Sequence, residues 1–572
     1  MSNFKTSPFR SKKPAWSAAM TAGVTILLIA IIVFTYAIPV KGTGEQANIL
    51  IWPIRIQDWW QTPAFANHLV ERISLAMFAT ICAMVAAYRR TRLLTAFEPV
   101  EKTYFESDAQ LYMGSNARVK LREYFSRKAG AASGGLWIAP HIQMPAALET
   151  DNIFINGNQN SGKSTIFRAL VEQKIASGAH VFLHCFKGEL SSAFGATDAV
   201  LIAPHVKGSW AWDIANDILN EQDARELAHR LIPGSDNPFW SDAARAVFTD
   251  LLVDLMTKRG RNWTWFDLGK SMFTTPEVIK DILAKHEISA APLLMMSEDG
   301  QPTNTTHGVL ATLITAVLTT VKSLAVAWQD TPPHRRFSVK AWLTDPNFPH
   351  KVVIFQSSAR YSELAQLIGR GIIDRVRAFL ADSSVPDSAT RRIVLALDEM
   401  AQLGELDTFD KLIATGRSKG LMVIAATQSI AQIKELYKGR SEIIRQLFRW
   451  QIVSSVPQGE PGETLAALLM SKRKVWWMEP NRARDGKGPM KVLKEDERYA
   501  LTPTQMERDL GVTFDDRGNK VVRALLLGAG DVYLLDYPNT TWLARRKTFA
   551  PAEWTKAINP RPSSGSTPSS PQ

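Results

Sequence analysis

Cysteine is almost absent from this sequence of 572 residues, which contains only Cys82 and Cys185. Two cysteines are too few for a small secreted fold held together by disulfides, and they exclude a zinc site with four cysteine ligands. Histidine provides no metal motif either, because His286-Glu287 lacks the second histidine of a zinc-protease helix. The chain is instead long enough for three or four domains, each with its own hydrophobic core.

Acidic residues are in deficit, with 55 Asp and Glu against 67 Lys and Arg, which gives a net charge of +12. Residues 1–92 contain ten basic and three acidic residues, and residues 471–494 contain eight basic and two acidic ones. The rest of the chain is nearly neutral. Charged residues make up 21% of the sequence, as in soluble proteins, so wholesale disorder is excluded. An anionic partner, either nucleic acid or lipid headgroups, is expected only at the two basic segments.

Long apolar runs occur only in the first 92 residues, which we interpret as a membrane anchor. No charged residue occurs between Pro14 and Val40, so a transmembrane helix is predicted at 16–40. A second helix is predicted at 69–88, and the connecting loop, 41–68, is expected to be periplasmic. A cleaved signal peptide is the alternative for the first segment, and a buried helix is the alternative for the second.

The flanking charges predict the orientation of this anchor. Four basic residues precede the first helix and three follow the second one, whereas the connecting loop has two basic and two acidic residues. By the positive-inside rule, both termini are expected in the cytoplasm and the loop outside it.

A phosphate-binding loop is the clearest motif of the chain. The apolar run 153–155 leads into Gly157-x4-Gly162-Lys163-Ser164, and a helix is predicted at 166–176. In this context the backbone amides surround phosphate oxygens, the lysine reaches the β and γ phosphates, and the Ser164 hydroxyl binds Mg²⁺. The predicted nucleotide-binding residues are Gly157, Asn158, Gln159, Asn160, Ser161, Gly162, Lys163, Ser164 and Thr165.

A second strand delivers two carboxylates. The apolar run 393–397 is followed by Asp398 and Glu399, at the end of the strand where α/β sheets place their sites. Asp398 is predicted to bind Mg²⁺, and Glu399 is predicted to act as the general base that activates water. The alternative is an ordinary buried strand followed by surface acids.

A third strand is predicted at 421–429, and Gln428 at its polar end could sense the γ-phosphate and orient the attacking water. Arg417 lies in the loop before this strand, where it could reach the nucleotide of a neighbouring subunit as an arginine finger. A solvent-facing strand end and a solvated loop cation are the respective alternatives.

The distance between Lys163 and Asp398 along the chain is much larger than a phosphate-loop core needs. The intervening region, 205–335, has helical periodicity and is predicted to be an inserted all-α domain. The fold class is therefore α/β, with a RecA-like nucleotide-binding core predicted at 93–204 and 336–558. The last residues, 559–572, are rich in Pro, Ser, Gly and Thr and are predicted to be a disordered tail.

The order of these features resembles the type IV coupling proteins of bacterial conjugation, of the TraD and TrwB kind. The segment Leu231–Trp240 (LIPGSDNPFW), Lys187-Gly188-Glu189-Leu190 and Ala431–Tyr437 (AQIKELY) also match this family, and the resemblance covers about residues 18–540. It implies an ATP- and Mg²⁺-dependent hexameric ATPase at the bacterial inner membrane. Such a protein recruits a relaxase bound to DNA and drives single-stranded DNA into the type IV secretion channel.

Two features depart from the family pattern. His184-Cys185-Phe186 occupies the place where the family usually has an aspartate before the Lys-Gly-Glu stretch, which puts the contacts of that carboxylate in doubt. The C-terminal residues of this sequence are few and not acidic, so we do not expect the long tail with which some relatives dock relaxosome proteins.

The basic segment 471–494 is the candidate DNA-binding surface. It combines cations that could follow phosphates with tryptophans that could stack on bases, a chemistry that tolerates any sequence. The alternative is a mobile, solvated loop whose tryptophans pack on the body of the protein. The candidate residues are Lys472, Arg473, Lys474, Trp476 and Trp477.

Two other functions remain compatible with the sequence. One is a membrane receptor for protein substrates of the secretion system that uses nucleotide only as an assembly switch. The other is a chromosome-type DNA translocase, which shares the core chemistry but is disfavoured by the prediction of two membrane helices instead of four.

Overall fold

The computed structural model describes most of the chain from residue 110 to residue 556, together with several helices and strands outside that range. The described residues are 5–6, 13–35, 38–39, 46–47, 57, 61, 63–95, 102–105, 110–129, 134–286, 289–388, 390–459, 462–463, 472–482, 489–499 and 501–556. The predicted tail 559–572 and most of the predicted periplasmic loop lie outside them. The chain divides into two compact units, residues 1–108 with 470–500 and residues 109–469 with 501–572.

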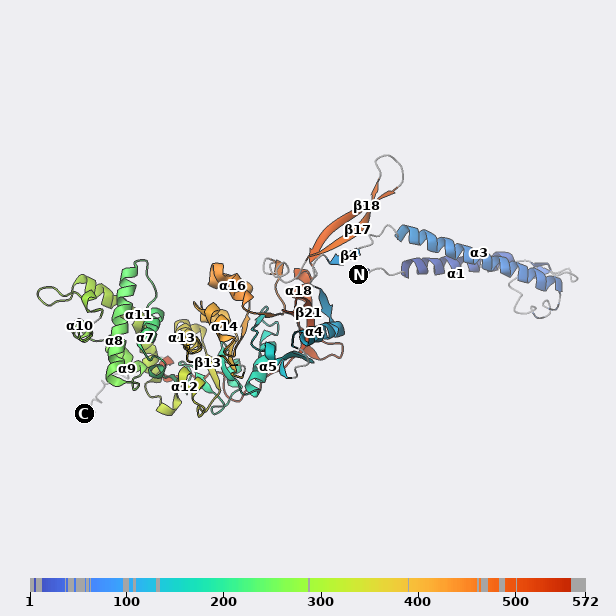
Figure 1. The fold of residues 1–572 in the computed structure, drawn as a ribbon. Helices are drawn as coiled ribbons and strands as arrows, with labels where there is room; N and C mark the ends of the chain where they lie inside the picture. Colours follow the sequence, from blue (N-terminus) through green and yellow to red (C-terminus); the bar gives the residue numbers. More distant parts are fainter. Residues whose placement is uncertain are drawn as a thin grey trace, which may run out of the picture. The chain divides into compact units, whose positions relative to one another are not determined.

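The N-terminal unit contains two long helices, α1 (Lys13–Thr35) and α3 (Pro63–Thr95), which lie side by side (Figure 1). Small residues permit their close approach, because a Cβ atom on Gly23 would lie 2.5 Å from the Met84 side chain. The packed residues Ala19, Ala30, Leu69 and Ala76 are buried, whereas the outward apolar side chains are exposed.

One helix of the described N-terminal residues, Ala66–Arg90, is long and apolar enough to cross a membrane. It contains the span predicted at 69–88. In α1 the corresponding apolar stretch is the shorter Ala19–Ala30, so the structure shows one clear candidate span where two are predicted. α1 as a whole has 23 residues, Lys13–Thr35.

The same unit contains a four-stranded sheet with the strand order β1-β4-β17-β18. β17 and β18 form a long antiparallel hairpin, so the described residues of the basic segment, 472–482 and 489–494, lie in two paired strands. The short strands β2 and β3 form a separate pair. The bounds are β1 Lys5–Thr6, β2 Ile38–Pro39, β3 Gln46–Ala47, β4 Lys102–Phe105, β17 Lys472–Arg482 and β18 Pro489–Tyr499.

The larger unit is built on an 11-stranded sheet with the order β10-β13-β9-β14-β15-β8-β16-β20-β21-β5, and β19 pairs with β20. The first seven strands are parallel, and β20 is antiparallel to β16 and β21. The predicted α/β class is thereby confirmed. The bounds are β5 Leu111–Met113, β8 Ile153–Asn156, β9 His180–Cys185, β10 Val200–Ile202, β13 Val352–Gln356, β14 Ile393–Leu397, β15 Leu421–Thr427, β16 Trp450–Val453, β19 Gly511–Phe514, β20 Lys520–Leu527 and β21 Val532–Pro538.

The central strands are continuous apolar runs because both faces of the sheet are covered by helices. Alternate residues enter two cores; in β9, for example, Phe182 lies in one core and Leu183 in the other. The covering and connecting helices are α4 Gly114–Ala129, α5 Lys163–Ala176, α6 Glu189–Ser192, α12 Val339–Thr344, α13 Ser362–Ala381, α14 Phe409–Gly416, α15 Ile430–Tyr437, α16 Ser441–Gln446 and α18 Pro503–Asp509. Two short strand pairs complete the unit, β6 Gly135–Ala139 with β7 Ile142–Pro145 and β11 Ala211–Trp212 with β12 Arg336–Phe337.

A group of helices occupies the region between β11 and β12, within the predicted all-α insert (Figure 1). Its buried residues are continuous with one core of the sheet, so the group packs as an extension of the α/β unit. The domain boundaries predicted from sequence stay a prediction. The helices are α7 Glu221–Leu231, α8 Pro238–Arg259, α9 Trp265–Met272, α10 Pro276–Leu283 and α11 Asn304–Trp328.

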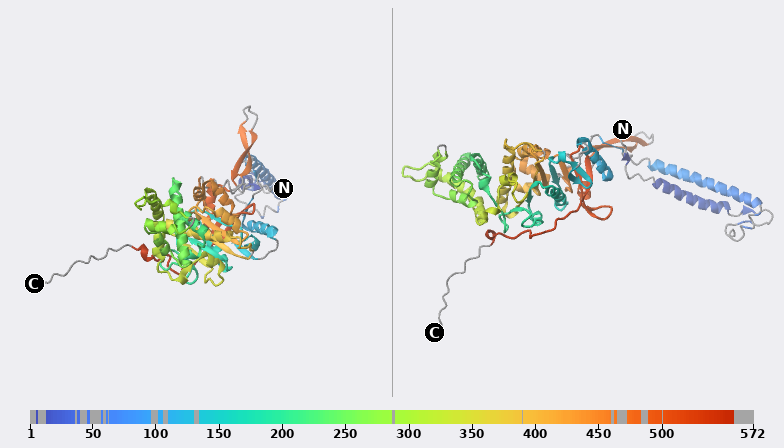
Figure 2. Two further views of the ribbon diagram at one scale, coloured as in Figure 1. Left: turned by 60° about the vertical axis from the view of Figure 1, so that its left-hand side comes forward. Right: turned by 60° about the horizontal axis from the view of Figure 1, so that its bottom comes forward.

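The segment that follows β21 returns along the unit toward these helices (Figure 2). Its backbone is anchored on the loop after β10, where the Lys207 N–H donates to the Ala550 carbonyl at 2.8 Å. The indole N–H of Trp554 donates to the Pro204 carbonyl at 2.7 Å. The segment therefore connects the last strand to the helical end of the unit.

Candidate nucleotide site

The glycine loop joins β8 to α5, as the sequence predicts. Gly162 caps α5 in the left-handed conformation, with φ at 89°, and Asn160 also has a positive φ of 62°. A Cβ atom on Gly162 would lie 2.5 Å from Val522 on β20. Glycine is therefore required here both for the backbone conformation and for the close approach of β20. The loop opens the N-terminus of a 14-residue helix toward the space above the sheet.

Lys163 is buried against its own loop. Its ammonium group donates to the carbonyl oxygens of Gly157 at 2.6 Å and Asn158 at 2.7 Å. Burial lowers the pKa of Lys163, while the negative charges of Glu399 and Asp398 raise it. The cation thus lies beside the two carboxylates that the sequence predicts to act with it.

Asp398 and Glu399 follow the last residue of β14, at the same sheet edge as the glycine loop. Burial raises the pKa of Asp398 to about 6. The Glu399 carboxylate accepts a hydrogen bond from the Thr427 hydroxyl at 3.1 Å and another from the Gln428 backbone N–H at 3.3 Å. Burial raises the pKa of Glu399 as well, against these two hydrogen bonds. The strand that follows in the sheet, β15, therefore fixes the orientation of Glu399.

These groups surround one cavity of about 370 Å³. It brings together most of the predicted loop residues, Asp398, Glu399 and Gln428, while Gly157 and Asn158 lie behind it and bind Lys163. The lining residues are Gln159, Asn160, Ser161, Gly162, Lys163, Ser164, Thr165, Cys185, Phe186, Lys187, Glu189, Asp398, Glu399, Gln428, Val512 and Lys520.

Six lining residues were not predicted as site residues, and two of them, Cys185 and Phe186, directly follow one another at the end of β9. Lys187 and Glu189 follow β9, and their sequence signal is the Lys-Gly-Glu stretch. Val512 and Lys520 come from β19 and β20, more than 300 residues after the glycine loop. No local pattern marks these two, because only the antiparallel pairing of the C-terminal strands brings them to the cavity.

His184 and Cys185, two of the residues that replace the family's usual aspartate, are buried and uncharged. His184 hydrogen-bonds the Ser357 hydroxyl through Nε2 at 2.8 Å, and burial lowers its pKa to about 3. Burial raises the pKa of the Cys185 thiol to about 11. This wall of the cavity therefore presents a neutral thiol where the family pattern has a carboxylate.

Within the described residues, no group of three or more His, Cys, Asp or Glu side chains could hold a metal ion unaided. Mg²⁺ is usually held by one or two protein oxygens together with phosphates and water. The Ser164 hydroxyl and the Asp398 carboxylate, which are predicted to bind this ion, both line the cavity.

Arg417 lies at the opposite edge of the sheet. It precedes β15, whereas the cavity is at the C-terminal ends of β8, β14 and β15. Its guanidinium pairs with the Asp151 carboxylate at 2.6 Å. Arg417 is therefore outside the cavity of its own chain, and its role as an arginine finger stays a prediction.

The DNA-binding candidates all lie on β17, in the N-terminal unit. In the hairpin register Lys474 pairs with Glu497 and Trp476 with Glu495, while Trp477 pairs with Lys494. The acidic run Glu495–Glu497 directly follows the basic segment 471–494 and lies opposite it, so part of the positive charge of the segment is balanced across the hairpin.

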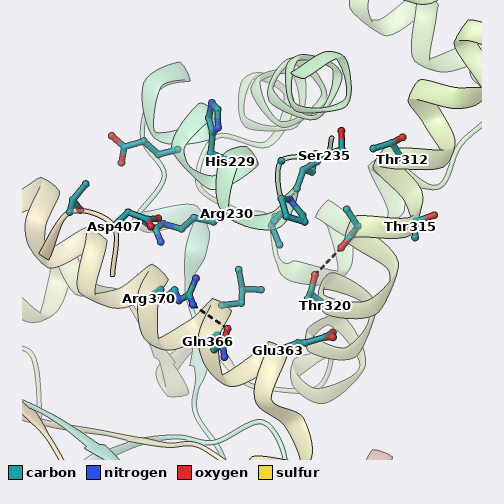
Figure 3. A pocket seen from close by; sticks show the side chains of 18 of the residues that line it. His229, Arg230, Ser235, Thr312, Thr315, Thr320, Glu363, Gln366, Arg370 and Asp407 are labelled. Carbon is teal, nitrogen blue, oxygen red and sulfur yellow. Dashed lines mark hydrogen bonds between the residues drawn. The ribbon is translucent and has the colours of Figure 1, made fainter. Parts of the chain in front are cut away.

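A second cavity, of about 1150 Å³, lies between the helical group and α13 (Figure 3). Arg230, Arg370 and Asp407 occupy one side of it, and Thr312 and Thr315 of α11 occupy the other. The segment Leu231–Ser235, which belongs to a stretch that resembles the coupling proteins, forms part of the wall.

The chain matches a family model described as the type IV secretion-system coupling protein DNA-binding domain, over residues 137–492. The chain belongs to this family. No curated protein sequence matches it. The family match includes the glycine loop, the Asp-Glu strand, the helical group and β17.

Solved structures of the plasmid coupling protein TrwB have the same fold. The complex of TrwB with ADP and Mg²⁺ is 19% identical, with a TM-score of 0.57 over 80% of this chain and 98% of TrwB. The complex with a non-hydrolysable ATP analogue is also 19% identical, with a TM-score of 0.54 over 78% and 97% of the two chains. Unbound TrwB gives 18% identity and a TM-score of 0.56 over 76% and 94%.

Proposed function

We propose that this coupling protein is a Mg²⁺-dependent ATPase that drives single-stranded DNA into a type IV secretion channel during conjugation. The observation that supports this most is the convergence of the glycine loop, Asp398 and Glu399 on one cavity in a chain of this family. TrwB, which has the same fold, has been solved with ADP and Mg²⁺.

The groups that line the cavity have different roles in the proposed reaction. The backbone amides of the loop and the Lys163 ammonium bind the phosphates, and Lys163 exchanges its two carbonyl partners for phosphate oxygens. Ser164 and Asp398 hold Mg²⁺, which neutralises phosphate charge when it is bound. Glu399, oriented by Thr427 and the Gln428 amide, accepts a proton from the attacking water. The Gln428 side chain, which lines the cavity, senses the γ-phosphate.

The membrane anchor and partners complete the proposal. The two N-terminal helices place both termini in the cytoplasm of a bacterial inner membrane, with α3 as the clearer span. The chain assembles as a homohexamer, in which Arg417 reaches the nucleotide of a neighbour, and it receives the relaxase-bound strand for the secretion channel. β17 contacts the DNA backbone.

ATP hydrolysis by the detergent-solubilised full-length chain tests this function. Single-stranded DNA is expected to stimulate hydrolysis, and Lys163→Ala is expected to abolish hydrolysis. Glu399→Gln should retain nucleotide binding and lower turnover by about 10² to 10⁴, the range for a lost general base. A lack of stimulation by any DNA under oligomerising conditions would contradict the pump. Loss of nucleotide binding in Glu399→Gln would contradict the role of that residue.

The receptor for protein substrates is the alternative that this experiment separates. In that case nucleotide binding drives assembly, and DNA leaves the hydrolysis rate unchanged. A chromosome-type translocase would also be stimulated by DNA, but it would act on duplex DNA without a relaxase.

A further inference from the structure

Asp151 occupies an unusual position at the sheet edge opposite the nucleotide cavity. It lies two residues before β8, the strand that leads into the glycine loop. The neighbours of β8 in the sheet are β15 and β16, and a basic residue precedes each of them, Arg417 and Arg449. The parallel order of these three strands therefore places one carboxylate between two guanidinium groups.

The contacts of Asp151 are unequal. Its Oδ1 lies 2.6 Å from the guanidinium of Arg417, and its Oδ2 lies 3.5 Å from Nε of Arg449. The Asp151 side chain is 1% exposed, whereas that of Arg417 is 61% exposed. A buried carboxylate thus forms an ion pair with the guanidinium of Arg417, most of whose side chain is exposed.

The backbone around Asp151 is fixed by its neighbour. The Asn152 side chain accepts a hydrogen bond from the Val423 N–H of β15 at 2.8 Å. It donates another to the Leu447 carbonyl, just before β16, at 3.1 Å. Asp151 is consequently held at a defined place relative to both flanking strands, and movement of the Arg417 loop away from it would break the ion pair.

Arg417 cannot serve the cavity of its own chain from this place. Six residues of extended chain separate Asp151 from Gly157, a distance of roughly 20 Å at the usual rise per residue. An arginine side chain does not cover that length. Any nucleotide that Arg417 contacts therefore belongs to another copy of the chain.

We propose that Asp151 is the positioning residue for Arg417, which it holds in place to reach the nucleotide of a neighbouring subunit. This inference rests on the proposed finger role of Arg417. An arginine side chain held by a buried carboxylate loses less conformational freedom on meeting a phosphate, so its geometry at the transition state is better defined.

Mixed oligomers test the assignment, because they report which nucleotide site a residue serves. Arg417→Ala alone should lower turnover by about 10³ or more, the range for a lost arginine finger. A mixture of Arg417→Ala with Lys163→Ala subunits should hydrolyse ATP faster than either variant alone. Interfaces in that mixture combine an intact Lys163 with an intact Arg417 from the neighbour.

Asp151→Asn should behave in the same way as the arginine variant. It should lower turnover by up to about 10², as expected for a misplaced catalytic group, with unchanged binding of a fluorescent ADP analogue. Mixed with Lys163→Ala, it should recover activity. Arg449→Gln is the matched control, because it removes the longer contact to the same carboxylate and should leave turnover close to that of the parent chain.

The outcomes separate the two proposals. If Arg417→Ala shows no recovery with Lys163→Ala, the finger role and the role of Asp151 are both overturned. If that mixture recovers and the Asp151→Asn mixture does not, Asp151 supports its own glycine loop, and only its assignment to Arg417 is wrong. Loss of activity in Arg449→Gln equal to that in Asp151→Asn would also overturn the assignment, since the carboxylate would then act through Arg449.

Discussion

The Nε–H of Arg370 donates a hydrogen bond to the carbonyl oxygen of Leu403 at 2.7 Å, and this contact joins α13 to the turn that follows Glu399. The same helix carries Asp374, which forms an ion pair with Arg230 of α7. These contacts connect the turn after Glu399 to α13, and α13 to the helical group. Arg370 and Arg230 both line the larger cavity (Figure 3).

Arg370→Ala is expected to destabilise the protein. The substitution leaves the carbonyl of a fully buried residue, Leu403, without its donor, and such a loss costs about 1–3 kcal/mol. Urea unfolding followed by tryptophan fluorescence measures the change. Arg225→Ala removes a surface pair with Glu221, so it should leave the transition unmoved. Equal shifts of the urea midpoint for the two variants would show that the hydrogen bond to Leu403 contributes no more to stability than the surface pair.

Gly162→Ala should abolish nucleotide binding. A Cβ atom at residue 162 would lie 2.5 Å from the Val522 side chain. Alanine also disfavours the φ of 89°, so the loop would have to change its conformation to accommodate alanine. Binding of a fluorescent ADP analogue and the melting temperature are the measurements. Gly518→Ala is the control, because Gly518 has a φ of 78° with no atom within 4 Å. It should lose about 1–2 kcal/mol of stability, the cost of a left-handed conformation for alanine, and should retain binding. Equal effects of the two substitutions on binding would show that the approach of Val522 is unimportant.

The glycine loop, β8, β14 and β15 were predictable because each is encoded by a short local pattern: an apolar run followed by glycines, carboxylates or polar residues. The contributions of Val512 and Lys520 were not, since they depend on the pairing of β19 and β20 with strands formed much earlier in the chain. The contact of Arg417 with Asp151 escaped prediction for the same reason, because it requires the strand order β15-β8-β16.

The basic segment shows a different limit of sequence interpretation. Its composition indicated cations interleaved with tryptophans, but it gave no sign that part of the segment pairs with three consecutive acidic residues. A window that ends at residue 494 leaves out Glu495, Asp496 and Glu497, which lie opposite Trp476, Val475 and Lys474. Charge counted along the chain therefore overstates the charge of the folded hairpin.

Acid should destabilise the protein through His205. This side chain is buried beside Phe549 and Tyr361, and burial lowers its pKa from 6.5 to about 4. The unfolded chain therefore binds a proton below pH 6.5 that the folded chain takes up only near pH 4, and stability falls as the pH falls through this window. The contribution of one such group is about 1.4 kcal/mol per pH unit at most.

His205→Phe removes this contribution and keeps an aromatic ring in the site. The free energy of unfolding, measured between pH 7 and pH 4, should therefore fall less steeply for the variant than for the parent chain. His334→Gln changes an exposed histidine and should leave the pH profile as it is. A parent-like slope in His205→Phe would assign the acid sensitivity to other groups.

Substitutions on the two strands of the β17–β18 hairpin should change DNA affinity in opposite directions. Replacing Lys472, Arg473 and Lys474 with alanine removes three phosphate partners. It should weaken single-stranded DNA binding equally for unrelated sequences and reduce the slope of log K against log salt by up to about 2. Glu495→Gln combined with Glu497→Gln removes negative charge at the positions paired with Trp476 and Lys474, and should strengthen binding. Fluorescence anisotropy over a salt series measures both effects. If neither variant changes the affinity, DNA is bound by another surface. The hairpin would then fit the alternative function, a receptor for protein substrates.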